Sequence, residues 1–213
     1  MEAARRVIPQ VFGELEMMTG RSYPVMDSYR MEGAEAAVVL RTSGGEVLTV
    51  QADVGEVSEA QRMVREAHAW RGRLDILVNC AGMNRRKAVL DVTPEDFESI
   101  MNIHVRGAYF SSQAAAPHMI AQGGGKIIHI GSATIRTGLA DVSVYGAAKA
   151  GMDALTRSMA VEWAEHNIQV NCLAPGFIMT ELTREGVWAN ERRSKWLLDR
   201  IPMRRPGAPD EMA

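Results

Sequence analysis

From about residue 46 onward, apolar residues follow two rhythms that alternate along the chain. Short runs of consecutive apolar residues that end in small residues are typical of buried parallel strands. Longer stretches with apolar residues three or four positions apart are typical of helices that pack on one face. The pattern predicts strands at 46–54, 74–82, 125–132 and 168–176, and helices at 58–70, 93–122 and 144–166.

Two of the predicted helices carry start signals. Thr93 is followed by Pro94, which suits the first helical position, and by Asp96, where a capping box places its acid. Ser58 and Gln61 have the spacing of a second capping box. We therefore expect both helices to be capped by these side chains.

The alternation of strands and helices predicts a doubly wound parallel sheet, a Rossmann-like α/β fold with helices on both faces. We expect residues 1–213 to form a single domain, truncated at both ends, in which residues 1–45 are atypical. In such sheets, ligands bind at the carboxyl ends of the strands. The segments QADV, NCAG, IGS and APG each close a predicted strand, so they are candidates for a binding site.

The composition narrows the possible functions. The chain is 46% apolar and 23% charged with a net charge of −2, which gives no basic surface for nucleic acid or a membrane. It shows neither a signal-peptide pattern nor an apolar run of membrane-spanning length, so we expect a cytoplasmic protein. Cys80 and Cys172 lie in apolar strand segments and are expected to be free, buried thiols. None of the five histidines has a partner at metal-ligand spacing, so no metal site is expected.

The segment SVYGAAKAG places Tyr145 and Lys149 four residues apart, on one face of a predicted helix, and Ser132 closes the preceding strand. An ammonium beside a phenol can lower the pKa of that phenol toward neutrality. A serine hydroxyl can hold a carbonyl oxygen while the tyrosine exchanges its proton. The three residues are therefore a candidate carbonyl-reduction site, which needs a cofactor because no side chain supplies hydride.

In this order and near these spacings, the motifs resemble the short-chain dehydrogenase/reductase family from about Ser43 to the C-terminus. The resemblance implies an NAD(P)-dependent oxidoreductase that interconverts a secondary alcohol and a ketone. It makes Ser132, Tyr145 and Lys149 the catalytic residues, and Lys149 would also hold a sugar hydroxyl of the cofactor. The matching positions are Asp53, Val54, Asn79, Cys80, Ala81, Gly82, Ser132, Tyr145, Lys149, Pro175, Gly176, Ile178 and Thr180.

The resemblance also implies cofactor contacts. Asp53 and Val54 would border the adenine, and the turn at 79–82 would support the sheet and line the ribose. The segment at 175–180, with Pro175, Gly176, Ile178 and Thr180, would close over the nicotinamide.

Finer similarity points to sugar-acid or polyol dehydrogenases of the gluconate 5-dehydrogenase type. It is carried by AGMNRR and by IPMRRPGAPDEMA. Arg85 and Arg86 suit a carboxylate substrate because a guanidinium pairs with a carboxylate through two parallel hydrogen bonds. Arg86 and Ser132 are therefore candidate substrate contacts. The 3-oxoacyl-carrier-protein reductases share the general motifs and stay an alternative.

The chain departs from the family in its first part. The family's glycine-rich turn cradles the pyrophosphate, and no intact copy is present. Thr19 and Gly20 begin such a turn, but Pro24 and Met26 stand where the next glycines belong. Arg21 lies just after the position of the family's NAD-selecting acid, which slightly favours NADP.

We interpret residues 7–16 as the tail of the first helix, 17–22 as a shortened second strand and 32–45 as the helix before the third strand. On this interpretation, the first strand and its phosphate loop would precede Met1. The alternative is an unrelated N-terminal segment that packs as an irregular cap.

Two further departures concern His104 and the C-terminus. His104 stands where the family has an asparagine that holds a water in the proton relay behind the lysine, and a neutral imidazole can still make that hydrogen bond. We therefore count His104 among the candidate catalytic residues. The sequence ends at Ala213, where the family continues into another helix and a last strand. Without that strand a sheet edge would be exposed.

Helices 93–122 and 145–166 resemble those of the family's dimer contact, so we expect a homodimer, and the absent last strand makes a tetramer doubtful. A different class of function is also open. A truncated paralogue that binds dinucleotide poorly could serve only as an oligomerisation partner of a full-length relative.

Overall fold

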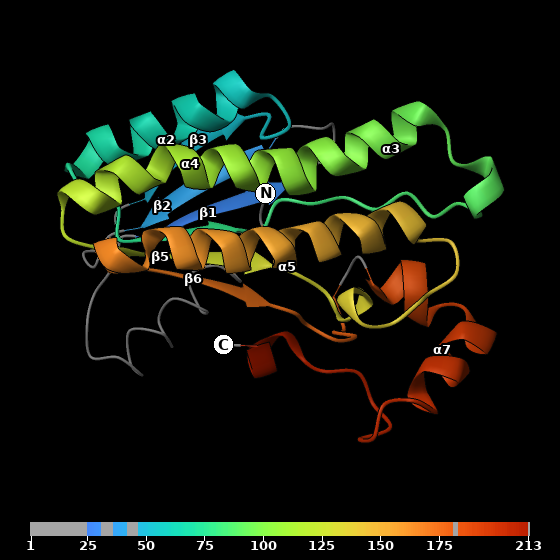
Figure 1. Ribbon diagram of the computed structural model, residues 1–213. Coiled ribbons are helices and arrows are strands. Elements are labelled where there is room, and N and C mark those ends of the chain that lie inside the picture. The colour runs from blue at the N-terminus through green and yellow to red at the C-terminus, as the bar shows by residue number, and fades with distance from the viewer. Residues whose placement is uncertain (1–24, 31–35, 42–46, 181–182, 213) are drawn as a thin grey trace. The chain divides into compact units, whose positions relative to one another are not determined.

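The structure is a computed structural model, and it describes residues 25–30, 36–41, 47–180 and 183–212 (Figure 1). The chain divides into two compact units, one whose described residues end at Ala174 and one whose described residues begin at Pro175. The single domain expected over 1–213 stays a prediction.

The first unit is built on a six-stranded sheet. Four of its strands, β1, β4, β5 and β6, are parallel neighbours, and β2 runs antiparallel to both β1 and β3. The order β3-β2-β1-β4-β5-β6 is the one common in dinucleotide-binding folds, and the Rossmann-like α/β prediction is confirmed. The strands are β1 Val25–Arg30, β2 Ala36–Arg41, β3 Val47–Ala52, β4 Ile76–Asn79, β5 Gly125–Ile130 and β6 Ile168–Leu173.

The reversed strand β2 corrects the prediction of a helix at 32–45. Ala36–Arg41 pairs with β3 so that Ala36 faces Ala52 and Arg41 faces Val47, the register of a hairpin. The run AAVVLR contains the β-branched residues that fit a pleated surface, and pairing on both sides outweighs the helix propensity of its alanines. The strand and helix predicted at 17–22 and 7–16 lie outside the described residues.

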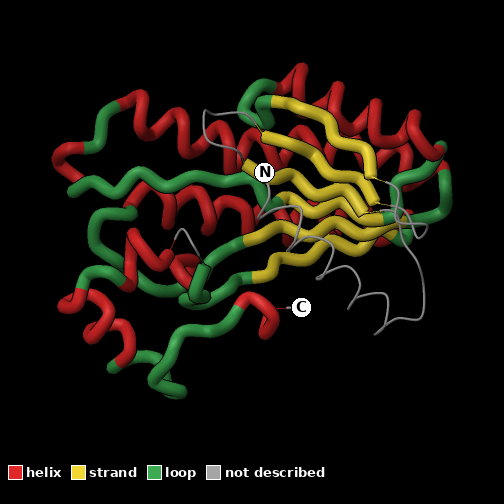
Figure 2. The backbone as a smooth tube through the Cα atoms, turned by 180° about the vertical axis from the view of Figure 1, so that it is seen from behind, coloured by secondary structure: helices red, strands yellow, loops and turns green. Residues whose placement is uncertain are grey.

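The long helices of this unit lie on one face of the sheet (Figures 1 and 2). In Figure 1, α2, α4 and α5 stand in front of the strands, and in the reverse view of Figure 2 the strands are nearer the viewer. All of the long helices described in this unit lie on this face. The helices are α2 Val57–Arg71, α3 Pro94–Met101, α4 Gly107–Ala121 and α5 Ser143–Trp163.

The two expected capping boxes have different outcomes. In α3, the Thr93 side chain accepts from the Asp96 N–H and the Asp96 carboxylate accepts from the Thr93 N–H, so this box is confirmed. The box expected from Ser58 and Gln61 is wrong, because α2 begins one residue earlier, after Glu56, with no side-chain cap.

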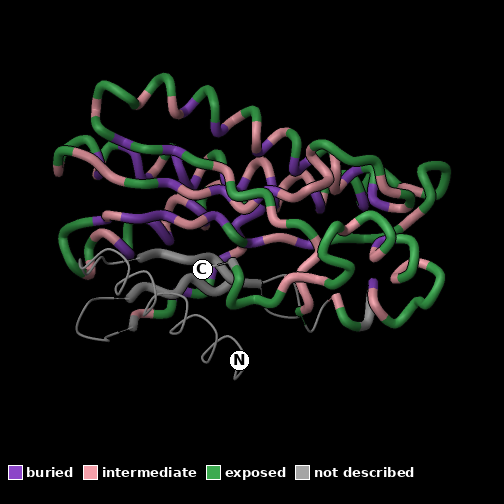
Figure 3. The backbone as a smooth tube through the Cα atoms, turned by 90° about the horizontal axis from the view of Figure 1, so that it is seen from below, coloured by how far each residue is buried: buried purple, intermediate pink, exposed green. Residues whose placement is uncertain are grey.

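The core lies where the helix layer meets the sheet (Figure 3). Leu77, Ile127 and Val170 form one row across β4, β5 and β6, and each is at most 6% exposed. The next row toward the carboxyl ends of the strands is Asn79, His129 and Cys172. The core therefore changes from apolar to polar toward the end of the sheet where ligands bind.

The second unit contains a parallel bridge between Ile178 and Gly207 and an edge-on contact of the Phe177 and Trp188 rings. Its helical segments are Arg184–Trp188, α7 Glu191–Leu198 and Pro209–Met212. In neither unit do the described residues include a helix that is long and apolar enough to cross a bilayer.

Candidate active site

Ser132, Tyr145 and Lys149 come together beyond the carboxyl end of β5. Ser132 caps the short 3₁₀ helix Ala133–Ile135 by accepting a hydrogen bond of 3.2 Å from Thr134 N–H. Tyr145 lies in the first turn of α5 and Lys149 lies one turn later. The Ser132 side chain lies close enough to the Tyr145 hydroxyl to influence its pKa, and Lys149 Nζ lies 5.6 Å from the centre of the Tyr145 ring. The structure thus assembles the predicted set, whose catalytic roles stay predictions.

Lys149 is a buried cation, with 3% of its surface exposed. Its Nζ donates to the carbonyl of Ile130, the last residue of β5. Burial lowers the pKa of Lys149 to about 8, while the charges of Cys80 and Cys172 act in the opposite direction. The ammonium is therefore held to the strand that leads into Ser132.

The pKa of Tyr145 moves opposite to the expectation. Burial of the phenol raises the pKa of Tyr145, and the Ser132 side chain only partly opposes that effect. Lys149 does not bring the pKa of Tyr145 toward neutrality, because its Nζ is directed at the Ile130 carbonyl. In this structure, Tyr145 is a protonated phenol at neutral pH.

His104 lies at the centre of a break in the helix expected over 93–122. Between α3 and α4, Asn102–Arg106 forms a π-helical turn, a feature often found at functional sites. His104 is 2% exposed, and its Nε2 lies 3.1 Å from the nitrogen and 2.8 Å from the oxygen of Met83. Its ring meets the Tyr145 ring edge-on, with 5.5 Å between centroids. The structure thus brings His104 to the candidate site, and its relay role stays a prediction.

Replacing His104 with asparagine is expected to raise kcat in any active form of the chain. Asparagine is the family's residue, and its smaller side chain leaves room for a relay water. General acid–base steps contribute on the order of 10²–10⁴-fold, so a better relay should raise kcat by about 2- to 10-fold. Steady-state kinetics of His104→Asn beside a His68→Asn control would measure this. An unchanged or lower kcat would remove His104 from the relay.

The turn at 79–82 packs tightly under His104. Asn79 is 5% exposed, and its Nδ2 donates to Ser112 Oγ in α4 over 3.0 Å. A Cβ on Gly82 would lie 2.4 Å from Cε1 of His104, so this position needs glycine. Ala81 is 8% exposed. These contacts fit a turn that supports the sheet, and its contact with a cofactor ribose stays a prediction.

Asp53 and Val54 form the turn between β3 and α2. The Asp53 carboxylate accepts from Gly55 N–H over 2.8 Å, and Val54 is buried. Gly107, the first residue of α4, lies against this turn, since a Cβ there would be 2.8 Å from the Val54 carbonyl oxygen. Close approach of α4 thus fixes this turn, whose contact with the adenine stays a prediction.

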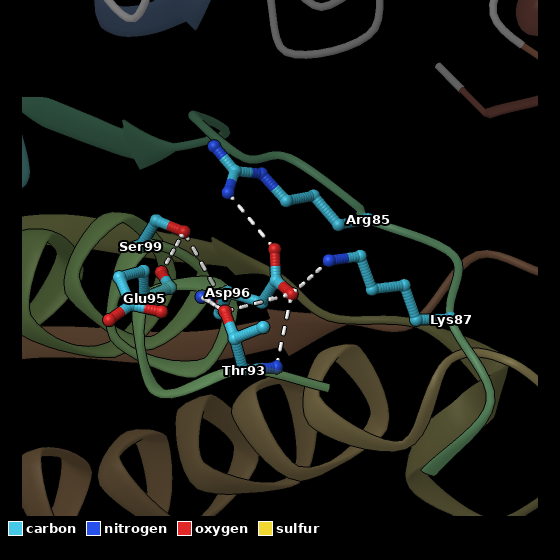
Figure 4. A network of polar contacts seen from close by, with 6 residues as sticks. All are labelled: Arg85, Lys87, Thr93, Glu95, Asp96 and Ser99. Carbon is cyan, nitrogen blue, oxygen red and sulfur yellow. Dashed lines mark hydrogen bonds and ion pairs between the residues drawn. The ribbon is translucent and has the colours of Figure 1, made fainter. Parts of the chain in front are cut away.

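Arg85 is paired with Asp96 and is not directed to a substrate carboxylate, contrary to expectation (Figure 4). Its Nη1 pairs with the Asp96 carboxylate at 3.0 Å, and Lys87 Nζ pairs with the other oxygen. Together with Thr93 N–H, these cations hold the pKa of Asp96 well below its usual range. Arg86, between them in the chain, is exposed. The Asp96 cluster therefore fixes the segment that carries Arg86.

We expect Asp96→Asn to lower the Tm by a few degrees at pH 7. The amide keeps the shape but removes the charge that pairs with Arg85 and Lys87. Because the folded pKa of Asp96 is depressed, its contribution is present above the unfolded pKa of about 4 and is lost in acid. Thermal unfolding at pH 7 and at about pH 2 should show the difference from wild type shrinking, because the folded carboxyl takes up its proton only well below pH 4. The exposed Glu98→Gln is the control, and equal Tm values for the two variants would contradict the prediction.

Pro175, Gly176, Ile178 and Thr180 belong to the second unit, so they are placed only within it. Thr180 and Thr183 cap each other: Thr180 N–H donates to Thr183 Oγ1 over 2.8 Å, and Thr183 Oγ1 donates to the Ile178 carbonyl over 2.6 Å. The segment is locally ordered by these bonds, and its closure over a nicotinamide stays a prediction.

Neither Cys80 nor Cys172 forms a disulfide bond, as predicted. Their expected burial is wrong, because Cys80 is exposed and Cys172 is partly exposed. The described residues contain no group of three His, Cys, Asp or Glu side chains that could hold a metal ion.

The sequence prediction missed His129, which is fully buried in β5 three residues before Ser132. It shares a sheet face with Ile127, and a polar residue on the buried face of a strand must be hydrogen-bonded. A histidine among apolar residues on the buried face of a predicted strand was the sequence signal that could have identified His129.

The chain is similar in sequence to proteins that are already known. Residues 21–213 match the family described as enoyl-(acyl carrier protein) reductase. The chain is 41% identical over 183 residues to the 2-dehydro-3-deoxy-D-gluconate 5-dehydrogenase of Escherichia coli (strain K12), which covers 85% of this chain and 72% of the relative. It is 36% identical over 170 residues to a 3-oxoacyl-[acyl-carrier-protein] reductase of Chlamydia pneumoniae, which covers 80% of this chain and 67% of that relative.

Among solved structures, the fold resembles a gluconate 5-dehydrogenase from Burkholderia cenocepacia J2315 in complex with NADP and tartrate. The TM-score is 0.72 at 38% identity, covering 75% of this chain and 62% of that chain. The match therefore spans less than two thirds of the solved relative. By fold, motif order and these matches, the chain belongs to the short-chain dehydrogenase/reductase family.

Proposed function

We propose that the chain is an NAD(P)-dependent oxidoreductase that interconverts a secondary alcohol and a ketone on a sugar acid or polyol. One observation carries the proposal. The Ser132 side chain lies close enough to the Tyr145 hydroxyl to influence its pKa, and a buried Lys149 lies beside the Tyr145 ring beyond the carboxyl end of β5.

The protonation state of Tyr145 suits the direction of ketone reduction. Its raised pKa keeps a proton on the phenol at pH 7, ready for transfer to a carbonyl oxygen. Ser132 would hold that oxygen by a hydrogen bond, and the charge of Lys149 would stabilise the phenolate that forms. Alcohol oxidation reverses these roles.

The described residues fit the nicotinamide and ribose end of a dinucleotide. The Tyr145 hydroxyl and the Lys149 ammonium can bind ribose hydroxyls, and Gly82 presents no side chain in the adjoining turn. The bound dinucleotide would supply the hydride. Asp53, Val54, Asn79, Ala81 and the segment at 175–180 are our further candidate contacts. NADP is favoured because it is bound in the solved gluconate 5-dehydrogenase. Arg21 lies outside the described residues.

A sugar acid is the substrate class that we favour. The Escherichia coli relative, named for a dehydro-deoxy-gluconate, is 41% identical, against 36% for the 3-oxoacyl reductase. We propose Arg86 as a contact for the substrate carboxylate. It is exposed on the segment after β4, and the pairs of Arg85 and Lys87 with Asp96 hold that segment in place.

We also propose a cytoplasmic homodimer that pairs through helices 93–122 and 145–166. Large apolar side chains stand exposed on these helices, among them Phe97 at 48%, Ile120 at 39% and Val161 at 80%. Burying them against a second copy would remove apolar surface from water. Cys80 and Cys172 are thiols that form no disulfide, which suits a reducing compartment.

A fluorescence titration of the chain with NADPH and with NADH tests the proposal. Binding in the micromolar range, followed by NADPH-dependent reduction of 5-dehydro-D-gluconate, is expected. Reduction of acetoacetyl-carrier protein without reduction of the sugar acid would shift the function to the 3-oxoacyl reductase. No binding of either dinucleotide up to millimolar concentration would overturn the enzyme proposal and leave the oligomerisation partner.

A further inference from the structure

A buried chain of hydrogen bonds runs behind the candidate site. Asn79 Nδ2 lies 3.0 Å from Ser112 Oγ, which lies 3.1 Å from His129 Nε2. His129 Nδ1 lies 2.9 Å from Thr156 Oγ1, which lies 2.8 Å from the Met152 carbonyl oxygen. The four side chains are between 0% and 6% exposed. The chain thereby joins β4, α4, β5 and α5 in a region that water does not reach.

The direction of every bond in this chain follows from its ends. The Met152 carbonyl can only accept, so the Thr156 hydroxyl donates to it and must accept from His129 Nδ1–H. At the other end the Asn79 amide nitrogen can only donate, so Ser112 accepts from it. With the single proton of a neutral imidazole on Nδ1, His129 Nε2 accepts, and the Ser112 hydroxyl donates to it. His129 is then a neutral imidazole with its proton on Nδ1.

The electrostatics agree with that assignment. Burial lowers the pKa of His129 to about 4, and the charge of Lys149 acts in the same direction. Cys80 and Cys172 are the other titratable groups that act on Lys149. At neutral pH the imidazole is therefore uncharged, and both of its nitrogens are used.

Helix α5 is attached to β5 at two points on one of its faces. Lys149 Nζ donates to the Ile130 carbonyl, and Thr156 accepts from His129, the residue before Ile130. Lys149 and Thr156 are seven residues apart, which is two turns of one helix face. Lys149 itself makes the first attachment. The bond between Thr156 and His129 is therefore the one that can hold α5 near β5 independently of Lys149.

We propose that His129 is a positioning residue for Lys149, acting through its Nδ1 bond to Thr156 rather than through its Nε2 bond to Ser112. The inference rests on the proposed role of Lys149 as the cation beside Tyr145. If the Thr156 bond is lost, α5 can separate from β5 and the Lys149 ammonium gains water.

Two substitutions of His129 separate its two bonds. The amide of asparagine occupies the place of Nδ1 and can still donate to Thr156, so His129→Asn keeps the bond to α5. The amide oxygen of glutamine occupies the place of Nε2 and can still accept from Ser112, so His129→Gln keeps only the bond to α4. Thr156→Val and Ser112→Ala cut the same two bonds from the other side, and His166→Gln repeats the glutamine change outside the chain of bonds.

The measurement is an NMR titration of the full chain with ¹³C-labelled lysine. The sequence has four lysines, so Lys149 can be assigned from its absence in Lys149→Met. We expect its pKa at about 8 in the wild type, His129→Asn, Ser112→Ala and His166→Gln. In His129→Gln and Thr156→Val, it should move toward 10.5 by about one pH unit or more, because hydration favours the ammonium.

The same Lys149 pKa in all variants, or an equal change in His129→Asn and His129→Gln, would overturn the proposal. If His129→Gln does not fold, Thr156→Val cuts the same bond with a smaller change of shape. An imidazole protonated on Nε2 in the wild type would also overturn it. The titration needs neither cofactor nor substrate, so a chain without enzymatic activity would leave this result standing.

Discussion

Replacing Lys149 with methionine is expected to stabilise the folded chain by about 2 kcal/mol at pH 7 while abolishing any oxidoreductase activity. Burial lowers the pKa of Lys149 from 10.5 to about 8, which corresponds to roughly 3 kcal/mol against keeping the ammonium in the fold. Methionine loses the hydrogen bond to Ile130, which offsets about 1 kcal/mol of that gain.

The difference in unfolding free energy between Lys149→Met and wild type should decrease as the pH rises. Between about pH 8 and pH 10.5, the unfolded chain still holds the lysine proton that the folded chain has released. Wild-type stability therefore rises with pH across that window, and the advantage of Lys149→Met shrinks. Urea unfolding at pH 7 and pH 9.5 measures both effects. The exposed Lys126→Met is the control, and a variant less stable than wild type at pH 7 would contradict the expectation.

Tyr145→Phe is expected to lower kcat by on the order of 10²–10⁴-fold and to leave the fold intact, because proton transfer by a positioned side chain contributes that much. The variant removes only the hydroxyl, so the ring keeps its edge-on contact with His104 and the chain should unfold at nearly the same denaturant concentration. Steady-state reduction of 5-dehydro-D-gluconate with NADPH provides the rate.

Tyr109→Phe is the matched control for this loss, since Tyr109 lies on α4 with 38% of its surface exposed. It should keep the wild-type kcat. NADPH affinity should also persist in Tyr145→Phe, because Lys149 still supplies a ribose contact. A Phe variant with an unchanged rate would remove Tyr145 from the proton transfer.

The strands were predictable from the sequence where a local run of apolar residues determines them. The apolar runs that became β4, β5 and β6 end in small residues at the same edge of the sheet. The reversal of β2 was not predictable, because Ala36–Arg41 has both helix-favouring alanines and strand-favouring valines, and its pairing with β1 and β3 decides. Local sequence carries no information about that pairing.

The site was predictable as a set of residues, and its electrostatics were not. Ser132 follows a strand and Tyr145 begins a helix, so their meeting follows from the order of the elements. The direction of the Tyr145 pKa depends on where Lys149 Nζ points, and it points to the Ile130 carbonyl, nineteen residues earlier in the chain. Likewise, the capture of Arg85 by Asp96 is a contact across eleven residues that spacing alone does not reveal.

The buried ammonium of Lys149 also bears on how such a sequence persists through mutation and selection. Most mutations destabilise a fold, and selection removes only those that take it below the stability that function needs, so a destabilising side chain uses part of a small margin. An oligomerisation partner without chemistry would gain by exchanging Lys149 for an apolar residue. Lys149 is only 3% exposed and lies beside the Tyr145 ring. Selection for a working reaction would retain such a buried ammonium.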